Sequence, residues 1–167
     1  MLRDFLSEKR TAILKRWQDL ILETYPPDAA RFFKQEKDSF ANPVGSSITR
    51  ALAGLFEELL GGGPGERIAP LLDDIIRIRA VQDFSPSRAI AFIFQLKGVI
   101  RAEVTGEGRE PRFLEELLEF ESAIDRLALQ AFDVYLQCRE QIFDIRVKEA
   151  RAWRGSALPA GERGKGG

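Results

Sequence analysis

The sequence predicts an all-α fold, a bundle of about six helices that ends in one long C-terminal helix. Three observations lead to this prediction. Apolar residues recur at helical spacing along most of the chain, proline follows a capping residue at two points, and no convincing strand pattern is present. At 167 residues, with 44% hydrophobic and 31% charged residues, the chain is long enough for one domain with its own core.

We expect four helices in the first half of the chain, over residues 2–25, 28–35, 43–60 and about 66–82. The first should stop before Pro26 and Pro27, because proline cannot continue a helix from within. The third should begin with Asn42 as its N-cap and Pro43 at the first helical position. The glycine-rich segment 61–65 then separates the third helix from the fourth.

Two more helices are expected in the second half, over residues 86–104 and about 111–153. Ser85 and Pro86 form the N-cap and first position of the earlier one. That helix is apolar nearly all round, which predicts a place in the middle of the bundle or against a partner. On its other side Ala91, Gly98 and Ala102 are small enough to allow close backbone approach. We therefore expect a single helical domain over residues 1–153 and a disordered glycine-rich tail over 154–167.

The run Ile76-Arg77-Ile78-Arg79 has the alternation of a strand, but its surroundings indicate a helix. At about 100° per residue, six apolar residues of 66–82 fall on one broad face. Arg77 falls opposite, four residues after Asp73, where it can form a solvent-exposed ion pair. Arg79 falls near the middle of the apolar face, so the helical interpretation predicts a buried arginine.

A buried guanidinium needs hydrogen-bond acceptors, ideally a carboxylate, because it cannot lose its proton. Asp83 is the nearest candidate and Asp38 a more remote one. Two interpretations remain open at this point. Arg79 is a structural clamp on the 82–86 loop, or it lies in a pocket that receives an anionic ligand. The residues of this possible ligand or ion-pair site are Arg79, Gln82, Asp83 and Phe92.

The long last helix carries an apolar seam in steps of four and three, typical of helices that pair along their length. We expect this seam to form a homodimer interface; its residues are Phe113, Leu117, Phe120, Ile124, Leu127, Ala131, Val134 and Cys138. A second stripe suggests that the helix has two buried faces, one for the domain core and one for a partner. That stripe consists of Leu114, Leu118, Leu129, Phe132, Leu136 and Phe143.

Composition argues against several classes of function. The chain has no histidine, which removes histidine-based nucleophile pairs, zinc sites and haem ligation, so we expect no enzyme, no metal and no cofactor. The net charge of −1 and a diluted basic end around Trp153 argue against nucleic acid. No segment is apolar enough to span a membrane, and with Cys138 as the single cysteine we expect a cytoplasmic protein.

Two blocks of the sequence, RFFKQEKDSFANPVGSSI (31–48) and RIRAVQDFSPSRAIAFIFQLKGVIR (77–101), carry a family resemblance. Each joins a capping motif to a fixed aromatic and charged context, and Trp17 followed by Tyr25-Pro26 fits the same pattern. Over most of residues 1–150 the chain resembles the N-terminal domain of the RsbR-type co-antagonist proteins of bacterial stress signalling, in the RsbRD branch.

The resemblance implies a non-catalytic sensor domain: a dimeric, globin-like helical module without haem, whose last helix leads into a second, phosphorylatable domain. The sequence ends at Gly167, so we expect that second domain to be absent, and kinase binding and phosphorylation are not carried over. The leading hypothesis is a signalling module that contacts a regulatory protein partner. The second is a binder of an amphipathic anion or acyl group, with the phenylalanines and Arg79 around an apolar pocket. A third, an enzyme built around Asp83 and Lys97, has no paired constellation to support it.

Overall fold

The computed structural model describes residues 1–63, 65–105 and 110–157, and every regular element among them is a helix. One apolar core joins all of the helices. The contribution of α3 to this core is small and comes mainly from Ala30. The bundle and its long last helix confirm the predicted fold class. The helices are α1 (Leu2–Glu8), α2 (Arg10–Leu22), α3 (Pro27–Gln35), α4 (Pro43–Leu60), α5 (Ile68–Val81), α6 (Pro86–Val104) and α7 (Pro111–Ala157).

The expected first helix is in fact two, because the backbone leaves the helical conformation at Lys9. The break lets α1 pack against α4 and α7 while α2 packs against α4 and α6. Leu6 of α1 and Trp17 of α2 are both completely buried. At its other end α2 stops at Leu22, and a turn leads into α3, whose first residue is Pro27.

Both predicted N-caps are confirmed. The Asn42 side chain accepts a hydrogen bond from the Gly45 N–H at 2.9 Å, and the Ser85 hydroxyl accepts one from the Arg88 N–H at 3.4 Å. Asn42 does more than cap α4, since it is buried and its amide also donates to two backbone carbonyls, those of Phe33 and Glu36. It therefore fixes the loop between α3 and α4.

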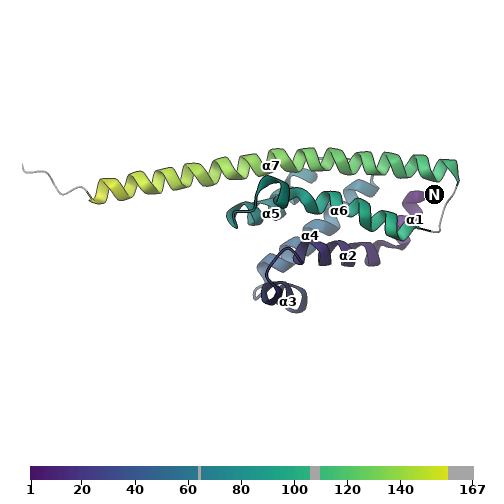
Figure 1. Cartoon of the computed structure of the whole chain (residues 1–167), viewed down its shortest axis with the longest axis horizontal. Helices are drawn as coiled ribbons and strands as arrows, with labels where there is room; N and C mark the ends of the chain where they lie inside the picture. Colours follow the sequence, from purple (N-terminus) through teal and green to yellow (C-terminus); the bar gives the residue numbers. More distant parts are fainter. Residues whose placement is uncertain (64, 106–109, 158–167) are drawn as a thin grey trace, which may run out of the picture.

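α7 spans 47 residues, about 70 Å at the rise of an α-helix. It lies along α5 and α6, and its C-terminal part projects beyond the bundle (Figure 1). Two ion pairs join it to α6: Arg101 holds Glu121 through two hydrogen bonds of 2.6 and 2.7 Å, and Lys97 meets Asp125 at 2.6 Å. The helix continues to Ala157, past the end expected near Trp153, and the rest of the expected tail lies outside the described residues.

α6 lies between α2, α5 and α7, which agrees with the central place that its apolar sequence predicted. Its small-residue side does not make the expected close contact within the chain. A Cβ atom built on Gly98 would meet no atom within 4 Å, and Phe94, one turn before it, is half exposed. Among the described residues, no helix combines the length and apolarity that crossing a bilayer requires.

The two caps allow a matched test of local stability. Asn42→Ala removes three hydrogen bonds at a buried position and should lower the free energy of unfolding by about 2 kcal/mol or more. Ser85→Ala removes one long, exposed cap bond and should cost less than about 1 kcal/mol. Urea denaturation of both variants measures the difference, and equal losses would contradict the structural role of Asn42.

Candidate functional site

Arg79 lies in the last turn of α5 and is completely buried, as the helical interpretation predicted. Arg77, on the opposite side, is exposed and holds Asp73 through two hydrogen bonds of 3.1 Å. The structure therefore confirms the helix and the places of both arginines. The fourth expected helix is shorter than predicted, since α5 begins at Ile68 and ends at Val81.

The acceptors of Arg79 are not the carboxylates that we expected. Its guanidinium donates to the Thr24 hydroxyl at 3.2 Å and to the Arg88 backbone carbonyl at 3.0 Å, while its Nε has no partner. In the described part of the chain no carboxylate lies within ion-pair distance of it. Asp38 instead accepts from the Phe40 N–H, and Asp83 pairs elsewhere.

Aromatic rings take the place of a carboxylate around Arg79. Its guanidinium carbon lies 4.3 Å from the centre of the Phe84 ring, 5.7 Å from that of Tyr25 and 5.9 Å from that of Phe92. The negative faces of these rings attract the cation without adding a countercharge. Burial nevertheless lowers the pKa of Arg79 from its ordinary value. A charged guanidinium is thus held at the junction of the α2–α3 turn, α5 and α6.

Asp83, in the α5–α6 turn, is bound by α7. Its carboxylate lies 3.1 Å from the Arg139 guanidinium and 3.6 Å from that of Arg146. Arg139 also donates to the Ala80 carbonyl at the end of α5, and the Tyr135 hydroxyl donates to the Phe84 carbonyl. The turn next to the buried arginine is therefore attached to the long helix by three of its side chains.

The remaining predicted residues of this site separate. Phe92 belongs to the core: it stacks with Trp17, and its carbonyl accepts the Trp17 indole N–H at 2.7 Å. Gln82 is exposed and lines a surface hollow of about 560 Å³. Its walls come from the two facing turns and the start of α6: Thr24, Tyr25, Pro26, Gln82, Asp83, Phe84 and Arg88. The structure brings Gln82 and Asp83 together in the hollow, whereas Phe92 does not line it and lies on the core side of the Arg79 guanidinium.

The seam assigned to a dimer interface packs inward in the single chain. Half of its residues, namely Ile124, Leu127, Ala131 and Cys138, are 2% exposed or less, and Phe113 is also buried. Leu117, Phe120 and Val134 are partly buried against the same core. The reason is that α5 and α6 cover this face of α7. Burial raises the pKa of the Cys138 thiol, which fits a packing role.

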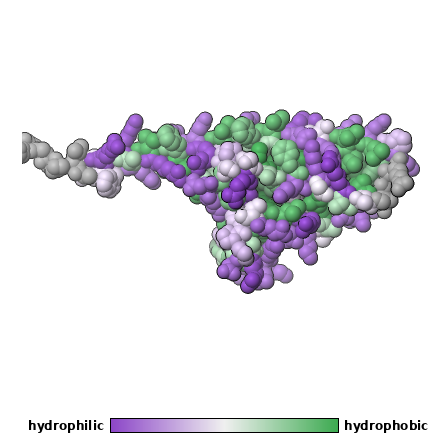
Figure 2. Space-filling view, viewed as in Figure 1, coloured by the Kyte–Doolittle hydropathy of each residue, from purple (hydrophilic) through white to green (hydrophobic). Residues whose placement is uncertain are grey.

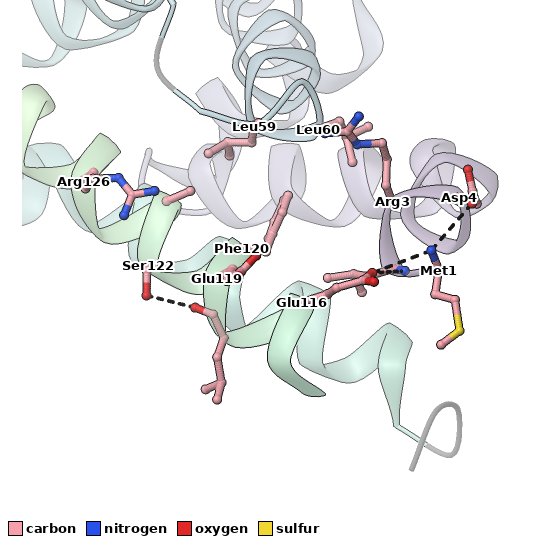
Figure 3. Close-up of a pocket in the computed structure, with 14 residues that line it drawn as sticks. Met1, Arg3, Asp4, Leu59, Leu60, Glu116, Glu119, Phe120, Ser122 and Arg126 are labelled. Atoms are coloured by element: carbon pink, nitrogen blue, oxygen red, sulfur yellow. Dashed lines mark hydrogen bonds and ion pairs between the residues drawn. The ribbon is translucent and has the colours of Figure 1, made fainter. Parts of the chain in front are cut away.

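A second hollow, of about 710 Å³, lies between α1, the end of α4 and α7 (Figure 3). Phe120 projects from α7 toward Leu59 and Leu60. At one end Glu116 accepts a hydrogen bond from the Leu2 N–H at 2.8 Å, which fixes α1 to α7. Cations and carboxylates balance around its rim, so the hollow carries no strong preference for a charged ligand.

Sequence reasoning missed the residues that reach this site from other helices. Arg139 and Arg146 lie seven residues apart on one helix face, a spacing that was visible but had no assigned partner. Thr24 accepts a hydrogen bond from Arg79 through its hydroxyl, and Arg88 accepts one through its backbone carbonyl. No local sequence pattern indicates such partners.

Replacing Arg79 tests its surroundings. Arg79→Met removes a buried charge and strands no carboxylate, so unfolding free energy should change by no more than about 1.5 kcal/mol. Arg79→Ala leaves a cavity and should cost about 2–4 kcal/mol. Urea denaturation compares the two, and a loss for Arg79→Met as large as that for Arg79→Ala would show that the charge itself is needed.

Glu116 gives a pH-dependent test. Its hydrogen bond from the Leu2 N–H lowers the pKa of the Glu116 carboxyl below its ordinary value of 4.5. A lowered pKa in the folded state stabilises the α1 contact above the ordinary pKa, and this contribution is lost as pH falls through the folded value. The protection factors of the amides over residues 2–8, which correct for the intrinsic pH dependence of exchange, should therefore fall at acidic pH. Glu116→Gln should remove that pH dependence; an unchanged profile would contradict the assignment.

Comparison with known proteins agrees with the geometry of a helical regulatory domain. Residues 11–149 match the family described as "RsbT co-antagonist protein rsbRD N-terminal domain". An uncharacterized protein of Archaeoglobus fulgidus is 27% identical over 144 residues, which cover 86% of this chain and 85% of that protein. No solved structure matches the chain. The match covers most of the sequence, so the chain belongs to the RsbRD N-terminal domain family, whose members are sensor domains of stress-signalling proteins.

Proposed function

We propose that this domain is a non-catalytic input module of stress-type signalling, which acts through protein contacts and through its long last helix. The observation that carries the proposal is the two-sided character of α7. Its inner face is buried on α5 and α6, and its outer face keeps apolar side chains in contact with solvent. A helix with one face in the sensor core and one face free is suited to pass a change in the core to a partner.

The first partner in this proposal is a second copy of the chain. The outer stripe extends over some 30 residues in steps of four, eleven, three, four and seven. Its members Leu114, Leu118, Leu129, Phe132, Leu136 and Phe143 are between 41% and 70% exposed. Figure 2 shows apolar side chains along this side of α7, with polar ones between them. Apolar stripes of this length are characteristic of helices that associate. The proposed interface is therefore this stripe rather than the buried seam.

α6 supports the same proposal. It packs beside α7, and Phe94, Gly98 and Ala102 lie one turn apart on a side that the chain leaves uncovered. Small residues in such a row allow a second helix to approach closely, and exposed phenylalanine adds apolar area. α6 and α7 of two copies would together make a four-helix contact.

The regulatory role, the cytoplasmic location and a further protein partner belong to the same proposal. Their support is membership of a signalling family and a sequence without histidine. The second hypothesis, an acyl or amphipathic-anion binder with an apolar interior pocket, is weakened at Phe92, because that residue packs against Trp17 in the core. Lys97 and Asp83 of the enzyme hypothesis are engaged with Asp125 and with Arg139, respectively.

Charge placed in the outer stripe tests the proposed dimer. The wild-type protein should sediment as a dimer, and Phe132→Glu should weaken association by about tenfold or more, because it puts a carboxylate into an apolar contact. Phe40→Glu makes the same change at a residue that is 95% exposed in the α3–α4 loop, and should leave the dimer intact. Analytical ultracentrifugation measures the association of the wild-type protein and of both variants. A monomeric wild type, or equal effects of the two variants, would overturn this interface.

A further inference from the structure

The hollow between the α2–α3 and α5–α6 turns has one cation, Arg88, and one carboxylate, Asp83, in its lining. Arg88 lies at its edge, exposed, with its guanidinium 4.9 Å from the centre of the Phe84 ring. Arg79 lies against the same ring from the buried side, at 4.3 Å. Within the described residues neither guanidinium has a carboxylate partner. Two cations thus share one aromatic ring, and the repulsion between them is one cause that lowers the pKa of Arg79.

The single carboxylate that lines the hollow is already neutralised. Asp83 is held by Arg139 and Arg146 from α7. Without those two arginines, Asp83 would repel an anion from the hollow. With them in place, the Asp83 charge is compensated, and the Arg88 charge is left without a carboxylate partner among the described residues.

The hollow also offers hydrogen-bond donors and apolar surface. Tyr25 lines it and adds apolar surface, because its hydroxyl oxygen is buried and is not exposed to the hollow. The Gln82 amide and the Arg88 guanidinium are exposed donors, and Pro26 and Phe84 supply apolar walls. Its volume, about 560 Å³, lies in the range of small-molecule sites.

We propose that this hollow binds a small organic anion, a molecule with one carboxylate or phosphate group on an apolar body, and that its affinity depends on the docking of α7 onto Asp83. Arg88 takes the charge, and Arg79 supplies a buried positive field behind it. Docking of Arg139 and Arg146 removes the repulsion from Asp83. By linkage, a bound anion then stabilises the docked position of α7 by the same coupling free energy.

Benzoate, with benzamide as its neutral counterpart, tests the binding. Wild-type protein should bind benzoate, and not benzamide, with saturable shifts of the amide NMR signals of residues 82–88. Arg88→Gln should weaken benzoate binding by about tenfold or more, since a charged hydrogen bond is lost. Arg77→Gln, which removes an exposed arginine of α5 outside the hollow, is the matched control and should bind as wild type.

Three results would overturn the site. Benzamide could bind as well as benzoate, or Arg88→Gln could bind as wild type does. Acetate, benzoate, phenyl phosphate and inorganic phosphate could all leave the signals unmoved at tens of millimolar. Each of these readings concerns the hollow alone and is independent of the oligomeric state, so the site and the proposed dimer can fail separately.

A charge-rescue cycle tests the coupling. The double variant Arg139→Gln/Arg146→Gln leaves Asp83 unneutralised and should weaken benzoate binding severalfold. Adding Asp83→Asn should restore it, and asparagine tolerates the left-handed conformation of residue 83, whose φ is 58°. If the double variant binds as wild type, or if Asp83→Asn fails to rescue, the coupling is overturned while the site stands.

The effect on α7 rests on the proposed function and has its own readout. Benzoate should slow amide hydrogen exchange over residues 135–146 of the wild-type protein. In the Asp83→Asn protein the slowing should be absent, although benzoate still binds. Equal slowing in both proteins would show that α7 responds through another route.

Discussion

The rest of this structure depends on how one buried guanidinium is accommodated. Arg79 cannot lose its proton, and a charge in a dry interior is costly unless its surroundings replace water. Here a hydroxyl of the α2–α3 turn, a carbonyl of α6 and three aromatic rings do so. Because these groups come from three segments, the α2–α3 turn, the α5–α6 turn and α6, the requirement of the charge fixes where those segments meet. The turns that border the hollow of Gln82 and Arg88 are positioned by the same contacts.

The long last helix is the second element that determines the behaviour of the domain. Its inner side contributes the apolar seam, and beside that seam Tyr135, Arg139 and Arg146 reach the α5–α6 turn. Its outer side is left apolar and exposed. A displacement of the turn would therefore act on α7 through two ion pairs and a hydrogen bond. Through α7 the displacement would reach any partner that binds the outer stripe, and no further element would have to move.

Local signals explain what the sequence could and could not predict. The caps at Asn42 and Ser85 and the burial of Arg79 follow from short-range pattern, and the structure confirms them. The helix break at Lys9 could not be predicted, since no glycine or proline marks it. The break accompanies the packing of α1 against α4 and α7. Arg139, a partner of Asp83, lies 56 residues away on α7. The periodicity of a helix shows which of its residues share a face, but it does not show which distant residues that face contacts. The same limit applies to the two stripes of α7: either could have faced the core, and the structure buries the seam.

The arrangement of charges around Asp83 gives the domain a physical basis for coupling an input to an output. In a hollow without contacts to α7, a carboxylate would repel an anionic ligand. Selection for binding alone would therefore favour a hollow without that carboxylate. Here the same carboxylate is what attaches the turn to α7. In the proposed site, the one carboxylate that would oppose the ligand is neutralised by α7, so the affinity would report the position of that helix. An input domain requires this property, and a protein that merely stores a ligand does not.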